Sequence, residues 1–313
     1  MKTLRRIPRK TENETGQIAR ARKPNHAAIT AEAFRGELVR YYSEAGPDYA
    51  AWSPNYNMHF GYYGRGMNPL RLEPMLDRMS REVLERLGQA VNGQLLDAGC
   101  GVGTAARFAA REFNARVTGI SIVPWQIEKA RALTDAQGMG ERTRFIQADY
   151  TRMPFPRETF EGVYAMESAC YAPGYNKRPL LREMYRVLKP GGRVVIADGF
   201  LKHRRPMHRW FKKVYDLVCR CWSLDTFAAR DDFLAAMKAE GFRNIRVEDI
   251  SWNVAPSAAF VPWTVVRFLC RELFRGGRRL TEKRRNNVIA PLMGLILGAA
   301  RKRFGYYIVT AEK

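Results

Sequence analysis

The fold of this chain is most constrained by the stretch Leu95-Leu96-Asp97-Ala98-Gly99-Cys100-Gly101-Val102-Gly103. An apolar run ends in an acidic residue, three glycines follow at every second position, and a helical pattern begins at Thr104. This order predicts a buried parallel strand that ends at the carboxyl edge of a sheet and turns sharply into a helix. Glycine suits that turn because a side chain would either forbid the backbone conformation or hold a ligand away from the main chain. A tight turn without a ligand is the alternative interpretation.

The spacing of these glycines differs from that of the common dinucleotide-binding loop. That loop has the pattern G-x-G-x-x-G, with an acidic residue about 20 positions later. Here the pattern is G-x-G-x-G, and the acid, Asp97, precedes the glycines. In this arrangement the chain resembles the S-adenosylmethionine-dependent methyltransferases.

Short apolar runs and helical patterns alternate along the chain around this loop. Such alternation is typical of a parallel sheet covered by helices. The predicted strands are 94–98, 116–121, 143–149, 160–166, 193–198, 242–250 and 306–310. We therefore expect an α/β fold with a Rossmann-like, seven-stranded methyltransferase sheet, a helical N-terminal segment and a helical insertion before the last strand.

The sequence pattern divides the chain into three parts. Residues 1–30 alternate basic and polar residues without a hydrophobic period, and we expect a flexible basic tail there. Residues 31–90 combine helical patterns with an aromatic loop, which predicts a helical and aromatic cap over a substrate. Residues 91–313 are expected to form the methyltransferase domain, with lid segments at 201–230 and 251–303.

The formal charge of +22 is concentrated outside the predicted sheet. Residues 1–40 carry a net charge of +6 and residues 201–313 one of +13, against +3 for residues 41–200. Basic appendages of this kind often bind a polyanion, either an anionic membrane or a nucleic acid.

The segments 207–224 and 261–274 combine apolar residues with Lys and Arg, as interfacial helices do. We expect peripheral contact with an anionic membrane; a simple lid over the site is the alternative. A nucleic-acid partner is disfavoured, because the chain lacks the Asn/Asp-Pro-Pro-Tyr motif of base-modifying methyltransferases.

Further features bear on location and on metals. No stretch reaches the roughly 18 uninterrupted apolar residues of a membrane span, and no apolar core follows the basic N-terminus as in a secretory signal. The five cysteines include no C-x-x-C pair, which suits a reducing compartment. The four histidines are not paired at the spacing of metal ligands. We expect a cytoplasmic protein, peripheral at a membrane surface, without a metal site.

A closer resemblance lies around the predicted fourth strand. Residues 94–198 look like a class I methyltransferase. Within them, Met153-Pro154-Phe155 and then Tyr164-Ala165-Met166-Glu167-Ser168-Ala169-Cys170-Tyr171-Ala172-Pro173 resemble the sterol C-methyltransferases. Tyr171 stands where that family has His. The tocopherol and the ubiquinone/menaquinone methyltransferases are similar in outline.

This resemblance implies methylation of a sterol or related isoprenoid lipid at carbon. A side-chain alkene attacks the sulfonium methyl group, and aromatic faces such as that of Tyr171 stabilise the resulting carbocation by roughly 0.5–2 kcal/mol each. Glu167 could stabilise this cation or accept its proton, with binding of the cofactor or of a helix N-terminus as the alternative role. His59 is a second candidate base, with a structural hydrogen bond as the alternative. The alternative function is O- or N-methylation of a small aromatic metabolite, with His59 as base.

The methyltransferase resemblance also implies a binding site for S-adenosylmethionine. The glycine loop is expected to lie against the methionine part of this cofactor. Asp97 is expected to order the turn by pairing with the amino group of the cofactor. Ser121 is expected beside the ribose and Asp149 near the adenine amino group. The complete set of expected cofactor residues is Asp97, Gly99, Gly101, Gly103, Ser121, Gln126, Asp149, Tyr150 and Met166.

Overall fold

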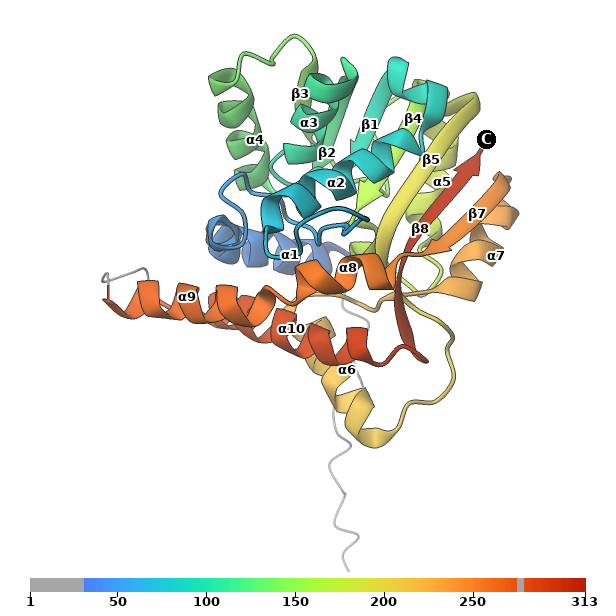
Figure 1. Ribbon diagram of the computed structural model, residues 1–313. Coiled ribbons are helices and arrows are strands. Elements are labelled where there is room, and N and C mark those ends of the chain that lie inside the picture. Colours follow the sequence, from blue (N-terminus) through green and yellow to red (C-terminus); the bar gives the residue numbers. More distant parts are fainter. Residues whose placement is uncertain (1–30, 275–278) are drawn as a thin grey trace, which may run out of the picture.

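A central sheet organises the structure, a computed structural model that describes residues 31–274 and 279–313 (Figure 1). The strand order is β3-β2-β1-β4-β5-β8-β7, and β6 pairs with β5 beside this path. The strands are β1 (Gln94–Ala98), β2 (Arg116–Ser121), β3 (Thr143–Gln147), β4 (Phe160–Met166), β5 (Leu188–Leu201), β6 (Ala228–Ala229), β7 (Arg243–Asp249) and β8 (Phe304–Glu312). Among the described strands, β8 runs antiparallel to β5 and β7, and the other pairings are parallel. The predicted seven-stranded sheet is confirmed, with the two-residue β6 as an addition. The predicted tail 1–30 lies outside the described residues.

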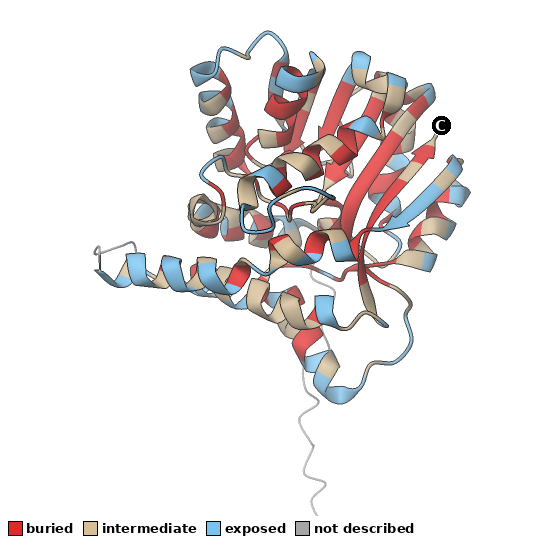
Figure 2. Ribbon diagram, in the orientation of Figure 1, coloured by how far each residue is buried: buried red, intermediate tan, exposed pale blue. Residues whose placement is uncertain are grey.

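Helices cover both faces of this sheet. On one face lie α2 (Leu72–Glu85), α3 (Thr104–Phe113) and α4 (Pro124–Ala136), with η2 (Gly88–Asn92) before β1; on the other lie α5 (Arg178–Val187) and α7 (Arg230–Glu240). Leu95 packs in the core of the first face and its neighbour Leu96 in the core of the second, because successive side chains of a strand point to opposite faces. Figure 2 shows the buried residues concentrated in the strands. The continuous apolar runs of the sequence follow from a sheet that is buried on both sides.

Further helices cover the carboxyl edge of the parallel strands. They are α1 (Ala31–Ala45) and η1 (Gly46–Ala51) before the sheet, η3 (Ala169–Tyr171) after β4, α6 (Arg209–Cys221) after β5, and α8 (Ser251–Ala258), α9 (Val261–Phe274) and α10 (Glu282–Ala299) between β7 and β8. In Figure 1, α9 lies along α10 and extends away from the sheet. The predicted helical insertion before the last strand is therefore confirmed.

A buried ion-pair cluster joins these helices. The guanidinium of Arg284 in α10 is 1% exposed and contacts Asp48 of η1 at 2.7 Å and Glu272 of α9 at 2.8 Å. A buried charge is strongly destabilising once its partner is removed. The cluster therefore holds the N-terminal η1 against the C-terminal insertion, although these segments are far apart in the sequence. None of the helices in the described ranges has the length and apolar character needed to cross a bilayer.

Candidate active site

The glycine loop has the backbone conformation that its sequence predicts. The φ angles of Gly99, Gly101 and Gly103 are +93°, +53° and +75°, which lie in the left-handed region that other residues rarely adopt. Space is short as well: a Cβ on Gly99 would lie 2.4 Å from the Cβ of Ser168, and one on Gly103 would lie 2.4 Å from the ring of Phe145. Glycine is required at both positions, and the loop brings its main chain to the cavity beside it.

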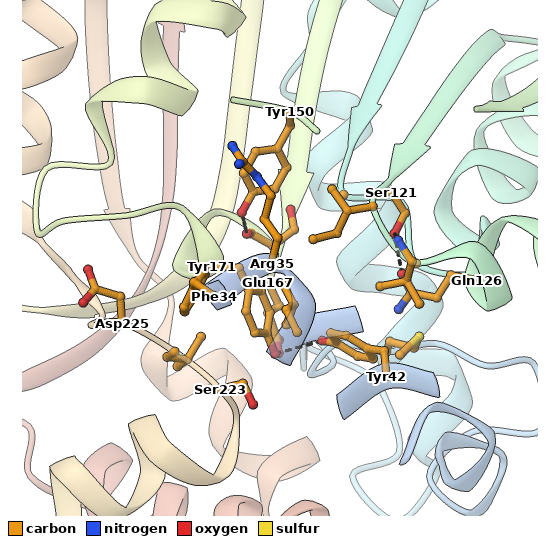
Figure 3. A pocket seen from close by; sticks show the side chains of 18 of the residues that line it. Phe34, Arg35, Tyr42, Ser121, Gln126, Tyr150, Glu167, Tyr171, Ser223 and Asp225 are labelled. Carbon is orange, nitrogen blue, oxygen red and sulfur yellow. Dashed lines mark hydrogen bonds between the residues drawn. The ribbon is translucent and has the colours of Figure 1, made fainter. Parts of the chain in front are cut away.

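A cavity of about 1090 Å³ lies at the carboxyl edge of the parallel strands (Figure 3). Eight of the nine expected cofactor residues line it, namely Asp97, Gly99, Gly101, Ser121, Gln126, Asp149, Tyr150 and Met166. Gly103 does not line it and instead forms the N-cap of α3. Open α/β sheets bind their ligands outside the carboxyl ends of the strands. We call this space the polar cavity.

Asp97 is a buried acid at the end of β1 that faces the polar cavity. Its Oδ2 atom is buried and has no hydrogen-bond partner within residues 31–274 and 279–313. Burial raises the pKa of this carboxyl to about 7. The Tyr164 hydroxyl favours the charged form of Asp97 but Oδ2 stays unpaired, and a ligand ammonium group here would pair with it and lower the pKa of the carboxyl further. The residues present therefore fit a ligand that carries an amino group and packs against the glycine loop.

Four of the expected cofactor residues already have side-chain partners within the protein. The Tyr150 hydroxyl donates to the carbonyl oxygen of Ser168 at 2.9 Å. Ser121 Oγ donates to Gln126 Oε1 at 2.6 Å. Asp149 Oδ1 accepts from the backbone N–H and the hydroxyl of Thr151, both at 2.7 Å, and its Oδ2 pairs with Nε of Arg35 at 2.5 Å. An amino group that approached Asp149 would therefore meet Arg35 of α1. Arg35 lies more than a hundred positions before Asp149, and no pattern in the sequence pointed to their pairing.

A second cavity, of about 660 Å³, has a mainly apolar lining, and we call it the apolar cavity. Its walls come from η1, α8, α9, α10 and the loop before α2. The aromatic lining residues include Tyr49, Trp52, Phe60, Trp222, Phe227 and Phe268. Its described lining residues include the acids Asp48, Glu167 and Asp198 and one arginine, Arg301; Asp48 is paired with Arg284, and Arg301 pairs with Asp249 at 3.1 Å. The cavity therefore suits a neutral apolar ligand better than an anionic one.

The polar and apolar cavities share one wall. It is formed by Tyr42, Met58, His59, Glu167, Tyr171 and Leu224, which line both cavities. The three residues predicted to be catalytic, Glu167, His59 and Tyr171, all belong to this shared wall. Ligands in the two cavities would meet there.

Glu167 has a strained backbone and two hydrogen-bond donors. Its φ angle is +46°, and such a conformation costs a non-glycine residue of order 1–3 kcal/mol and is concentrated at functional sites. Its Oε1 accepts from the backbone N–H of Phe60 at 2.6 Å and from the hydroxyl of Tyr306 at 2.8 Å. Burial raises the pKa of this carboxyl to about 8, although both donors favour the charged form. Glu167 is thus a fixed carboxyl that can exchange a proton near neutral pH.

His59 and Tyr171 differ in how they are held. His59 Nδ1 lies 2.9 Å from the carbonyl oxygen of Phe60, to which it donates, and burial lowers the pKa of the imidazole. Its Nε2 is buried and without a partner among the described residues, so the neutral ring keeps a free acceptor. The Tyr171 hydroxyl accepts from the Tyr42 hydroxyl at 2.8 Å, and the two rings are 5.8 Å apart. Both predicted residues thus present a polar atom or an aromatic face at the shared wall.

Two buried charged residues behind this wall were not expected from the sequence. The Nζ of Lys177 donates to the carbonyl oxygens of Cys170 at 2.8 Å, Ala172 at 2.6 Å and Thr226 at 2.6 Å. Asp198 accepts from the backbone N–H of Cys170 at 2.9 Å. Together they hold η3, which contributes to the shared wall. A lone lysine in a sequence gives no sign that tertiary packing will bury it.

Comparisons with known proteins agree with this geometry. Residues 95–192 match a family model described as a methyltransferase domain. The chain is 30% identical over 233 residues to Methyltransferase GfsG from Streptomyces halstedii. The matched region covers 74% of this chain and 81% of that protein. It is 28% identical to Sterol 24-C-methyltransferase ERG6B from Gibberella zeae, over 82% of this chain and 63% of the relative. Geranyl diphosphate C-methyltransferase from Streptomyces coelicolor A3(2) has a similar fold, with a TM-score of 0.67 at 18% identity over 90% of this chain and 98% of the other.

The glycine loop, Asp97, Asp149 and Glu167 all lie inside the matched region 95–192. The GfsG match extends the similarity across most of both chains. The resemblance seen in the sequence is therefore confirmed, and S-adenosylmethionine is the cofactor. The chain belongs to the S-adenosylmethionine-dependent methyltransferases.

Proposed function

We propose that this protein transfers a methyl group to a carbon atom of a neutral isoprenoid lipid, of the sterol class or related to it. The observation that carries the proposal is the shared wall, where Glu167, His59 and Tyr171 separate a polar cavity from an apolar one. Cofactor and lipid would occupy the two cavities, and the methyl group would pass at this wall. Residues 31–90 then serve as a substrate cap, and 201–230 and 251–303 as lids.

In this proposal the polar cavity holds S-adenosylmethionine. Asp97 pairs with its amino group, and the main chain at Gly99 and Gly101 lies against its methionine part. Ser121 with Gln126 lies beside the ribose, Asp149 with Tyr150 beside the adenine, and Met166 near the methyl group. Gly103 contributes by starting α3 rather than by contact. The lone Oδ2 of Asp97 and the glycine backbone support this orientation.

The lining of the apolar cavity supports a neutral lipid. Its volume lies within the roughly 300–1,000 Å³ of small-molecule sites. An anionic head group would find no free cation among the described lining residues, because Arg301 is already paired with Asp249, as Asp48 is with Arg284. A relative is named as a sterol 24-C-methyltransferase, and a structural neighbour as a geranyl diphosphate C-methyltransferase. Of these two substrate types, the lack of a free cation among the described lining residues favours the uncharged one.

The residues of the shared wall can carry out the chemistry that such a substrate needs. S-adenosylmethionine supplies an electrophilic methyl group. As the alkene forms its new carbon–methyl bond, a positive charge develops on the lipid, and the rings of Tyr42 and Tyr171 stabilise it by cation–π attraction. The same positive charge favours the ionised form of Glu167, and this carboxylate attracts the charge and accepts the proton whose loss restores a double bond. The mainly apolar lining of the apolar cavity would limit the access of water to the cation.

Product analysis tests this proposal. The protein is incubated with methyl-labelled S-adenosylmethionine and a lipid extract, and the labelled product is identified by mass spectrometry and NMR. A methyl group on carbon, with a new or shifted double bond, supports the proposal. A methyl group on oxygen or nitrogen refutes it and indicates direct displacement with His59 as base. The Glu167→Gln variant serves as the control for background transfer.

A further inference from the structure

Helix α9 has two apolar faces, and the apolar cavity accounts for one of them. Val261, Thr264, Val265 and Phe268 line that cavity. Trp263, Val266 and Leu273 do not, and they are 64%, 52% and 76% exposed. With about 100° between successive residues, the two sets centre on opposite sides of the helix. Packing among the described residues therefore leaves the outer apolar face of α9 uncovered.

The position of this outer face makes it accessible. Figure 1 shows α9 extending beyond the body of the molecule with α10 along one side, and Figure 2 shows much of α9 exposed. The stripe continues to the end of the helix, where Phe274 is 85% exposed. A projecting helix with a tryptophan and aliphatic side chains on one face is the form of an interfacial membrane helix.

The charges around the stripe indicate which surface it fits. Arg267 and Arg271 are exposed, and by helical spacing both lie between the outer and inner faces, with Arg267 the nearer to the outer face. Arg267 also donates to the carbonyl oxygen of Ala51. The one acid among the described residues of α9, Glu272, points inward to the buried Arg284. Apolar side chains flanked by arginine, without an exposed acid, complement the acyl boundary and the anionic head groups of a bilayer.

We propose that the outer face of α9 docks on an anionic bilayer, with Trp263, Val266 and Leu273 buried at the level of the head groups. This inference rests on the proposed function, because the inner face of the same helix lines the cavity assigned to the lipid. Docking would place the wall of that cavity directly at the membrane surface. The acceptor could then pass from the bilayer to the shared wall without crossing bulk water.

Vesicle co-sedimentation tests the docking face. We compare the wild-type chain with the double variant Trp263→Gln, Val266→Gln and with the control Val247→Gln, whose side chain is 36% exposed on the edge strand β7. Vesicles are made of phosphatidylcholine, alone or mixed with phosphatidylserine. We expect the wild type and the control to bind the mixed vesicles, more weakly at high salt, and the double variant to bind at least about tenfold more weakly.

Further measurements separate the outcomes. Thermal melting and S-adenosylmethionine binding should be the same in all three proteins, which excludes misfolding as the cause of lost vesicle binding. If the wild type fails to bind mixed vesicles, or if the double variant binds as well as the wild type, the docking proposal is wrong. A dimer in solution that the double variant abolishes would also overturn it, since the face would then bind a second copy. Vesicle binding is measured without methyl transfer and so does not depend on it. Failure to find a carbon-methylated lipid would therefore refute the proposed function and leave the docking proposal standing.

Discussion

Replacing Glu167 by Gln should make the protein more stable and inactive. The amide of Gln keeps an oxygen that can accept from the Phe60 N–H and the Tyr306 hydroxyl, but it cannot ionise. Burial raises the pKa of Glu167 from its ordinary 4.5 to about 8 in the folded protein. Between these two pH values the unfolded chain releases a proton that the folded chain retains. Folding stability of the wild type therefore falls as pH rises through this window.

The size of the effect follows from the two pKa values. They lie about 3.5 pH units apart, and each unit corresponds to about 1.4 kcal/mol. The stability of Glu167→Gln relative to wild type should therefore increase by about 1.4 kcal/mol per pH unit from roughly pH 5 to pH 8, and level off near 5 kcal/mol above that. Contributions of acids that are not coupled to Glu167 cancel in this difference, because both proteins contain them; Asp198, whose charge raises the pKa of Glu167, remains coupled to it.

The assay is urea denaturation of both proteins without cofactor at a series of pH values, together with kcat for methyl transfer. A stability difference that does not change with pH would show that Glu167 is not a destabilised buried acid. A kcat near that of the wild type would remove Glu167 from the mechanism. A variant that gains stability and loses turnover is the expected result for a carboxylate held in an unfavourable environment for its function.

Three further substitutions test the fold and the site. Gly99→Ala places a Cβ at a φ of +93° and 2.4 Å from a neighbouring side chain. S-adenosylmethionine binding measured by calorimetry should therefore weaken by about 5- to 150-fold through strain of about 1–3 kcal/mol; an unchanged Kd would contradict the need for glycine. Arg284→Met breaks a buried ion pair and should lower the free energy of unfolding, measured by urea denaturation, by about 3–5 kcal/mol. The control Arg285→Met, at an exposed position, should change it by less than about 0.5 kcal/mol. Equal effects of the two substitutions would refute the role of the cluster. Lys177→Met leaves three buried carbonyl groups without their donor, which costs about 1–3 kcal/mol of stability for each group. The Tm should therefore fall by about 5 °C or more. An unchanged Tm in scanning calorimetry would contradict this role of Lys177.

The sequence by itself determined the sheet and the place of the cofactor loop. The bounds of β1, β2 and β4 agree with the predicted strands, because a strand buried on both faces needs an unbroken apolar run that turn residues interrupt. The left-handed backbone at Gly99, Gly101 and Gly103 is equally local, since it depends on a missing Cβ rather than on distant partners. Local patterns were sufficient for both features.

Only the tertiary structure decided how the site is divided and what controls its charges. Glu167 receives its hydrogen bonds from Phe60 and Tyr306, which lie 107 and 139 positions away, and its raised pKa comes from burial that no local pattern records. The pairing of Arg35 with Asp149 depends in the same way on segments that the fold brings together. The outer face of α9 could be recognised only once its inner face was seen to line the apolar cavity. Periodicity shows that a helix is apolar, whereas the packing of neighbouring segments decides which of its faces remains exposed.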